Sequence, residues 1–133
     1  KLGQYNEVSR QKRFFKECEN HKILLKQLLN TIKKQGKSIV GYGASTKGNV
    51  ILQYCGINEK LINKIAEVNK YKFDRYTPGT NIKIVSEKKA MKNIPDYLLV
   101  LPWHFKDNII KRENKFLKKG GKLIFPLPDI EII

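Results

Sequence analysis

The spacing of apolar residues changes near residue 36. Between about Tyr5 and Gln35, apolar residues recur at helical spacing and lysines fill many of the positions between them. The stripe contains Val8, Phe15, Cys18, Leu25, Leu29 and Ile32. This pattern predicts one long amphipathic helix that Gly36 ends. Its stripe must pack against the body of the domain or also against a neighbouring domain.

After residue 36, short apolar runs alternate with segments of helical spacing. We expect strands at residues 38–42, 64–68, 96–101 and 122–125. We expect helices at residues 46–55, from a Ser86 cap through Met91, and at 105–117. Alternating strands and helices predict a Rossmann-like α/β fold, a parallel sheet flanked by helices. A single domain would then consist of the long helix (1–36) and a βα core (37–133).

The predicted strands lead into segments rich in turn residues and distinctive side chains. These segments are residues 41–48, 69–80, 102–104 and 126–128. Open parallel sheets bind ligands outside the carboxyl ends of their strands. We therefore expect the four segments to converge on one rim.

A glycine-rich loop joins the first predicted strand to the next helix. Such a loop presents free backbone N–H groups and the positive end of a helix dipole, which suits a phosphate. The third glycine comes too late for a dinucleotide fingerprint, and no Gly-Lys-Ser/Thr sequence makes a Walker A loop. The alternative is a tight turn with a solvated lysine. The candidate contacts are Gly41, Tyr42, Gly43, Lys47, Gly48 and Asn49.

Two further segments supply candidate ligand contacts. Glu67 ends the second predicted strand, where a dinucleotide fold places a ribose-binding acid; otherwise it is a solvated carboxylate. Residues 69–80 interleave basic and aromatic residues, which suits base stacking on tyrosine and charge from Arg75. Pro78, Gly79 and Thr80 form turn chemistry in which Gly79 takes a positive φ. The alternative is an ordinary surface loop.

Trp103 and His104 follow the most apolar predicted strand. A histidine there could act as a general base near neutral pH. No partner carboxylate is identifiable, and Asp107 could equally cap the following helix. We therefore assign no catalytic residue and keep His104 as a candidate, with ligand hydrogen bonding or helix entry as the favoured roles.

The composition narrows the classes of partner. A formal net charge of +15 favours anionic partners, but the lysines are spread over the whole chain and no nucleic-acid motif is present. A nucleic-acid binder is therefore the least favoured function. Two cysteines and two histidines make neither a disulfide framework nor a metal cluster, so we expect no metal. The absence of an apolar run of membrane-spanning length favours a cytoplasmic chain with no membrane partner.

Several short motifs occur in an order that resembles one enzyme family. They are Gly-Tyr-Gly-Ala-x-x-Lys-Gly-Asn at 41–49, Tyr-Cys-Gly-Ile at 54–57, Tyr-Thr-Pro-Gly-Thr-x-Ile at 76–82, Pro-Asp-Tyr at 95–97, Leu-x-Trp at 101–103 and Gly-Gly-Lys-Leu-Ile-x-Pro-x-Pro at 120–128. Together they resemble the C-terminal domain of S-adenosylmethionine-dependent C-methyltransferases that act on keto-deoxysugar nucleotides. The resemblance runs from residue 38 to the end, and the first helix fits it too.

The resemblance implies a fragment of a three-part enzyme. Such enzymes have an N-terminal zinc domain, a central domain for the methyl donor, and this Rossmann-like domain, which helps to bind the nucleotide-sugar. Proton removal beside a sugar ketone precedes attack of the enolate on the donor methyl, with catalytic groups mainly from the central domain. We find no zinc cysteines and no second glycine motif. The chain alone is therefore expected to be inactive and to bind no cofactor, and its partners are the nucleotide-sugar and the other domains.

Two positions depart from the family pattern, and one alternative function stays open. The family usually has Asp where this chain has Glu67, and Asn where it has His104. The first change still suits ribose binding, whereas the second leaves the role of His104 unassigned and is consistent with a different sugar. The alternative is a stand-alone NAD(P)-type dinucleotide-binding domain, against which the glycine spacing argues.

Overall fold

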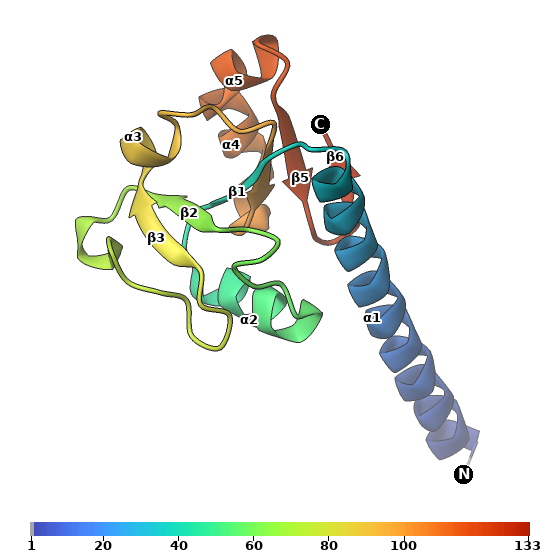
Figure 1. The fold of residues 1–133 in the computed structure, drawn as a ribbon. Helices are drawn as coiled ribbons and strands as arrows, with labels where there is room; N and C mark the ends of the chain where they lie inside the picture. Colours follow the sequence, from blue (N-terminus) through green and yellow to red (C-terminus); the bar gives the residue numbers. More distant parts are fainter. Residues whose placement is uncertain (1) are drawn as a thin grey trace.

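A six-stranded sheet forms the centre of the computed structural model (Figure 1). The structure describes the backbone of residues 2–133 and side chains from Glu7 onward; Lys1, the first residue of the expected 1–36 helix, lies outside the described residues. The strand order is β3-β2-β1-β4-β5-β6. The strands are β1 (Ile39–Tyr42), β2 (Lys64–Glu67), β3 (Lys83–Ser86), β4 (Tyr97–Val100), β5 (Lys122–Phe125) and β6 (Glu131–Ile132). All neighbours pair in parallel except β5 and β6, so the expected α/β fold is confirmed.

Helices cover both faces of the sheet because the strands are apolar on both faces. In β4, Tyr97 and Leu99 pack into one buried cluster and Leu98 and Val100 into the other. The first cluster lies under α1 (Leu2–Lys34) and α2 (Thr46–Cys55). The second lies under α3 (Glu87–Ala90), α4 (Lys106–Arg112) and α5 (Asn114–Lys118). Short 3₁₀ turns, η1 (Lys70–Lys72) and η2 (Trp103–Phe105), precede β3 and α4.

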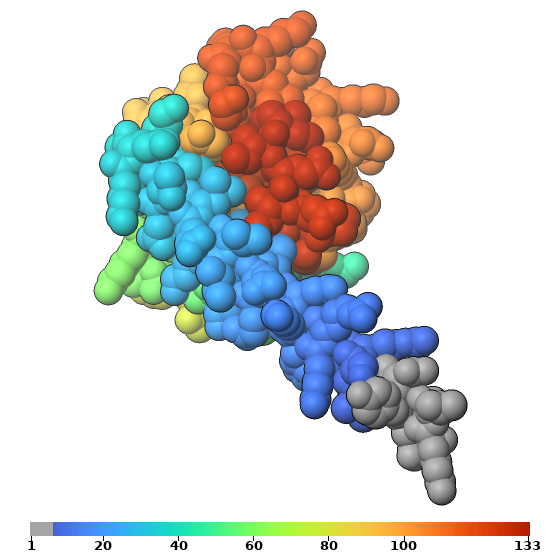
Figure 2. Space-filling model, turned by 90° about the vertical axis from the view of Figure 1, so that its right-hand side faces the viewer, coloured from blue at the N-terminus to red at the C-terminus, as the bar shows by residue number. Residues whose placement is uncertain are grey.

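The long helix α1 behaves differently along its length. Leu25, Leu29 and Ile32 are buried against the sheet, as the apolar stripe predicts. Phe14 and Phe15 are 63% and 69% exposed, and this part of α1 extends beyond the rest of the molecule (Figures 1 and 2). The stripe therefore predicts the helix correctly, while the described chain covers only its C-terminal half. No helix among the described residues combines the length and apolarity that crossing a membrane requires.

Two expectations about the elements are wrong. Four strands were predicted and six are present; the missed strands, β3 and β6, are the two edges of the sheet. Edge strands pair on one side only and here carry charged residues, Lys83 and Glu131, so their apolar signal is weak. The predicted helix at 105–117 is divided into η2, α4 and α5, and Glu113 separates the last two with φ −95° and ψ 22°.

The topology reverses direction between β1 and β4. The chain leaves β1 through α2 on one face to reach β2, whereas β4 is reached through α3 on the other face. The carboxyl ends of β1 and β4 therefore diverge into segments on opposite faces. Such a switch point is where open α/β sheets form their ligand crevice.

Candidate functional site at the carboxyl edge of the sheet

The glycine loop leads directly from β1 into α2. Gly43 donates its N–H to the carbonyl of Ala66 at 2.8 Å, which ties the loop to β2. The hydroxyl of Ser45 accepts the N–H of Gly48 at 3.0 Å and so caps α2. A Cβ on Gly48 would lie 2.5 Å from Cβ of Leu101, so only glycine lets the first turn of α2 pack this closely over the end of β4.

A cavity of about 380 Å³ opens beside this loop; we call it the carboxyl-edge cavity. Gly43, Ala44 and Ser45 form one wall. Lys72, from the segment after β2, and Arg112, from α4, form others. The cavity therefore lies at the switch point, and two loops that follow neighbouring strands meet there.

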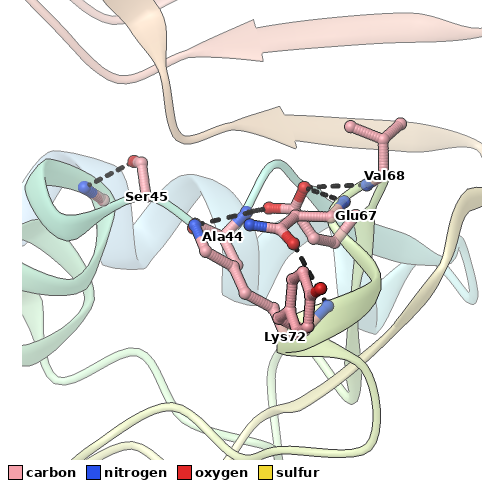
Figure 3. Close-up of polar contacts among 8 residues, drawn as sticks. Ala44, Ser45, Glu67, Val68 and Lys72 are labelled. Atoms are coloured by element: carbon pink, nitrogen blue, oxygen red, sulfur yellow. Dashed lines mark hydrogen bonds and ion pairs between the residues drawn. The ribbon is translucent and has the colours of Figure 1, made fainter.

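Glu67 is the most strongly held polar group in this cavity wall. It is 8% exposed, and its Oε1 accepts the N–H of Ala44 at 2.9 Å (Figure 3). Its Oε2 accepts the N–H groups of Val68 and Asn69 at 2.7 and 2.9 Å. Interpreting this residue as a solvated carboxylate is therefore wrong, because the carboxylate is buried and bonded to three backbone amides.

A second polar group joins β1 to α4. The hydroxyl of Tyr42 donates to Glu113 at 3.1 Å and accepts from Arg112 at 3.0 Å. Arg112 also donates to Glu87 at 2.7 Å. Burial and the nearby Glu113 carboxylate raise the pKa of Tyr42 well above its ordinary value of 10.0, although Arg112 opposes the shift. The hydroxyl therefore stays protonated at neutral pH and keeps its hydrogen bond to Glu113.

The charges that line the cavity are largely paired with each other. Lys72 lies 3.9 Å from Glu67, and Arg112 lies 2.7 Å from Glu87. Additional attraction for an anion therefore has to come from the N-terminus of α2, where the first amides have no preceding turn to bond. Lys47 is exposed on this first turn and carries a positive charge there, although it is not one of the residues that line the cavity.

The cavity also has an apolar wall. Phe105 and Ile109 line it from η2 and α4, and Phe105 is 54% exposed. Pro102 contributes from the end of β4, and Asn108 adds an amide. A pocket with a flat aromatic surface and a few fixed polar groups suits a small organic ligand.

The second predicted loop lies away from this cavity. Pro78 accepts a hydrogen bond from the side chain of Gln53 in α2 at 2.8 Å, and Gly79 packs against the same side chain. Gly79 has φ 74°, as its turn chemistry predicts. The hydroxyl of Thr80 is buried and bonded to that of Thr77. Arg75 is exposed, and the carbonyl of its backbone accepts the N–H of Ile84; none of these residues lines the cavity.

The other predicted site residues divide between packing and surface positions. Gly41 lies within β1, and Trp103 packs against both buried clusters. His104 is exposed, and its ring centroid lies 4.3 Å from that of Phe105 with the two planes tilted by 44°. No hydrogen bond to its side chain is found among the described residues. Asn49 lies near the start of α2, and its Oδ1 is buried without a hydrogen-bond partner in the described part of the chain. The rim therefore gathers Tyr42, Gly43 and Glu67, and leaves His104 outside.

Sequence reasoning missed most of the residues that line the cavity, and five of them bear on its polar character or on the loop. They are Ala44, Ser45, Asn108 and Arg112, together with Lys72, which was noted only as part of the 69–80 segment. Phe105, Asn108 and Arg112 repeat every three or four residues, a helical spacing that could have placed them on one face. No pattern in the sequence indicates that the Glu67 carboxylate accepts hydrogen bonds from backbone N–H groups.

A second cavity, about 320 Å³, lies between α1, α2 and the loop after β5; we call it the helix groove. Phe14, Val50 and Tyr54 line it together with Leu127 and Pro128. The segment 126–128 was expected at the common rim, and this expectation is wrong: Pro126 accepts a hydrogen bond from His21 of α1 instead. Packing of the loop against α1 explains the difference.

No cluster of three potential metal ligands occurs among the side chains that the structure describes. Both carboxylates of the carboxyl-edge cavity are already engaged, Glu67 by amides and Glu87 by Arg112. The cavity therefore offers the amides of the glycine loop at the start of α2 and an apolar wall, which together suit an anionic organic ligand.

Comparison with known proteins agrees with this geometry. Residues 3–128 match the family described as the C-methyltransferase C-terminal domain. The chain is also 33% identical over 120 residues to the C-methyltransferase NovU of Streptomyces niveus. This alignment covers 90% of the chain but only 29% of the relative, so the chain spans less than a third of that protein's length. The resemblance drawn from the ordered motifs is confirmed: the chain belongs to the C-methyltransferase family and is its C-terminal domain.

Proposed function

We propose that this chain is the substrate-binding domain of an S-adenosylmethionine-dependent C-methyltransferase that acts on a keto-deoxysugar nucleotide. The diphosphate lies at the glycine loop and the first turn of α2, near Lys47. The rest of the ligand extends into the carboxyl-edge cavity, against the exposed ring of Phe105. Two free thiols, Cys18 and Cys55, suit a reducing cytoplasm.

One observation carries this proposal. The carboxyl-edge cavity lies at the switch point of the sheet and combines a glycine loop, a helix N-terminus and an apolar wall. Ligands of open α/β sheets bind at this point, and phosphates bind at helix N-termini. A nucleotide joined to a deoxysugar presents both an anionic group and less polar rings.

The alternative of an NAD(P)-binding domain is less well supported. Dinucleotide folds use the acid at the end of β2 to hold ribose hydroxyls. Here both oxygens of Glu67 accept backbone N–H groups, and Lys72 lies 3.9 Å away. Binding a ribose through this carboxylate would require those bonds to be broken.

The methyl donor and the catalytic base are assigned to the rest of a longer enzyme. S-adenosylmethionine would supply an electrophilic methyl group, and the reaction needs a base and an enolate stabiliser. The described chain has one glycine loop, and no hydrogen bond joins His104 to a carboxylate among the described residues. This domain would therefore bind and orient the substrate and contribute little to the chemical step.

The exposed half of α1 is proposed to contact another domain of the same enzyme. Phe14 and Phe15 are more than 60% exposed, and Phe14 also lines the helix groove beside Val50. Adjacent exposed aromatic residues with an apolar groove beside them are typical of a surface that is covered in an assembly. The contact between α1 and the other domain would also set the distance between the bound sugar and the methyl donor.

Titration calorimetry tests the ligand assignment. The chain is titrated with dTDP, GDP, NAD and S-adenosylmethionine, and the series is repeated with Lys47→Ala and with the exposed control Lys60→Ala. We expect one nucleoside diphosphate to bind, Lys47→Ala to weaken it roughly tenfold, as for loss of a charge-assisted contact, and Lys60→Ala to leave it unchanged. Tight NAD binding would overturn the proposal, as would nucleoside diphosphates failing to bind both this chain and the full-length enzyme.

Charge substitutions test the covered surface. Phe14→Asp should leave the stability of this chain nearly unchanged, because the side chain is largely exposed, but should destabilise the full-length enzyme. Lys16→Asp places the same charge on the same turn of α1 and serves as the control. Equal effects of Phe14→Asp in the short chain and the full-length enzyme would contradict the contact.

A further inference from the structure

The network around Ala44 shows how the glycine loop is held. Ala44 lies at the centre of the loop, between Gly43 and Ser45, and is 6% exposed. Its N–H donates to Glu67 at 2.9 Å, and its carbonyl accepts from the ammonium of Lys72 at 2.6 Å (Figure 3). Both polar groups of this one residue are therefore held by side chains from the end of β2 and from the turn that follows it.

The same carboxylate also shapes the segment from which it comes. Glu67 accepts the N–H groups of Val68 and Asn69, the two residues that follow it. The side chain of Asn69 then accepts the N–H of Tyr71 at 3.1 Å and begins η1, which carries Lys72. The carboxylate and the ammonium thus belong to one continuous network, in which the turn that positions Lys72 depends on Glu67.

A carboxylate suits this position better than any neutral side chain. Its oxygens only accept hydrogen bonds, and three N–H donors point at them. A glutamine of the same shape would turn an N–H₂ group toward at least one N–H donor. Bonds to a charged acceptor are also stronger than neutral ones, and a buried charge is tolerated only when it is bonded in this way.

We infer that Glu67 is a positioning residue which, with Lys72, fixes the conformation of the glycine loop, and that it does not contact the ligand. The effect of Glu67 on ligand binding rests on the proposed function, whereas its effect on the loop conformation does not. The loop is held before the ligand arrives, so the amides at the start of α2 are already directed at the anion. Preorganisation of this kind lowers the cost of ordering a loop on binding.

We call the contacts of Glu67 and Lys72 with Ala44 the clamp. Amide hydrogen exchange tests it without a ligand. Exchange of the Ala44 amide is followed by NMR in the native chain, in Glu67→Gln and in Lys72→Met. Glu67→Gln should accelerate exchange at Ala44 roughly 10- to 100-fold, the change expected from loss of a charge-assisted hydrogen bond. The amide of Leu99 in β4 should keep its rate, which shows that the fold persists, and Glu59→Gln, an exposed site, should change neither rate.

Either of two results would overturn the clamp. One is an Ala44 amide that already exchanges freely in the native chain. The other is an Ala44 amide whose protection survives Glu67→Gln. If Glu67→Gln also accelerates amide exchange at Leu99, the variant disturbs the fold itself. The exchange rate of Ala44 is then compared between the native chain and the milder Lys72→Met variant, which leaves the carboxylate in place.

A binding measurement tests the consequence. With the nucleoside diphosphate that binds the native chain best, Glu67→Gln should weaken binding about tenfold, and Glu67→Asp, whose shorter side chain cannot span to Ala44, should not restore it. Unchanged affinity together with faster Ala44 exchange would overturn the positioning role. If no nucleotide binds the native chain or the full-length enzyme, the proposed function fails, and the exchange experiment still decides the clamp.

Discussion

The two cavities of this domain are built in different ways. Hydrogen bonds between polar groups fix the walls of the carboxyl-edge cavity. They include the bonds from Ala44 N–H to Glu67, from Tyr42 to Glu113 and from Arg112 to Glu87. Apolar side chains from α1, α2 and the loop after β5 form most of the helix groove. Preorganised polar groups are what a small ligand needs for orientation, whereas an open apolar groove suits the side chains of another protein surface.

The two cavities also correspond to two kinds of residue in and next to α2. The carboxyl-edge cavity reaches α2 only at its capping serine, Ser45, next to a first turn that contains Gly48. The helix groove lies along the outer face of α2, which carries Val50 and Tyr54. The first turn is specialised for close approach and the outer face for contact area. Substitutions on the two sides of α2 should therefore have very different effects.

The largest effect is expected at Gly48. A valine there would place Cβ 2.5 Å from Cβ of Leu101 and 2.9 Å from the hydroxyl of Ser45. We expect Gly48→Val to lower the free energy of unfolding by about 3 kcal/mol, at the upper end of overpacking effects. Val50→Ala, two residues on and 62% exposed, should change it by less than about 0.5 kcal/mol. Urea denaturation measures both, and similar values for the two would remove the distinction between the cavities.

Tyr42 should show a smaller effect that depends on pH. Tyr42→Phe removes the bonds to Glu113 and Arg112, so we expect a loss of about 1 kcal/mol at neutral pH. Because burial raises the pKa of Tyr42 in the folded chain, the unfolded chain loses this proton first as the pH rises through 10.0. Stability should then fall by up to about 1.4 kcal/mol per pH unit until the folded chain also loses the proton.

The matched variant isolates this slope. Other tyrosines also ionise above pH 10, so the difference between the native chain and Tyr42→Phe is the quantity to plot. It should favour the native chain at neutral pH and diminish steadily in alkaline solution. A difference that is constant with pH would show that Tyr42 ionises alike in the folded and unfolded chains.

The smallest effect is a difference in thiol reactivity at the helix groove. Cys55 is 1% exposed, and burial raises its pKa, so little reactive thiolate is available. Cys18 lines the same groove from α1 and is partly exposed. Iodoacetamide should modify Cys18 at least about tenfold faster than Cys55, as peptide mass spectrometry would show. Equal rates would mean that α1 separates from α2 in solution.

The fold was largely predictable because its signals are local. The apolar run of β4, the change of period near residue 36 and the glycine loop each follow from neighbouring residues. The edge strands β3 and β6 escaped prediction because a strand paired on one side needs little apolar sequence. The stripe of α1 predicted a helix but could not tell which part of it this chain covers.

The site was less predictable because its contacts join distant residues. Glu67 and Ala44 are 23 positions apart, and Tyr42 and Arg112 are 70 apart. Position in the fold suggested a ribose ligand at Glu67, but the carboxylate bonds the loop itself. Arg112 and Asn108 reach the cavity only because α4 packs beside β1, which no local pattern reveals.

Mapping of the bound nucleotide by NMR tests the central claim most directly. Amide shifts of the ¹⁵N-labelled chain would be followed during titration with the nucleoside diphosphate that binds best in calorimetry. The account predicts that Gly43, Ser45, Lys47 and Phe105 shift together, while Val50 and Leu127 in the helix groove do not. Shifts confined to the helix groove, or to Gly79 and Thr80, would contradict a substrate site at the carboxyl edge of the sheet.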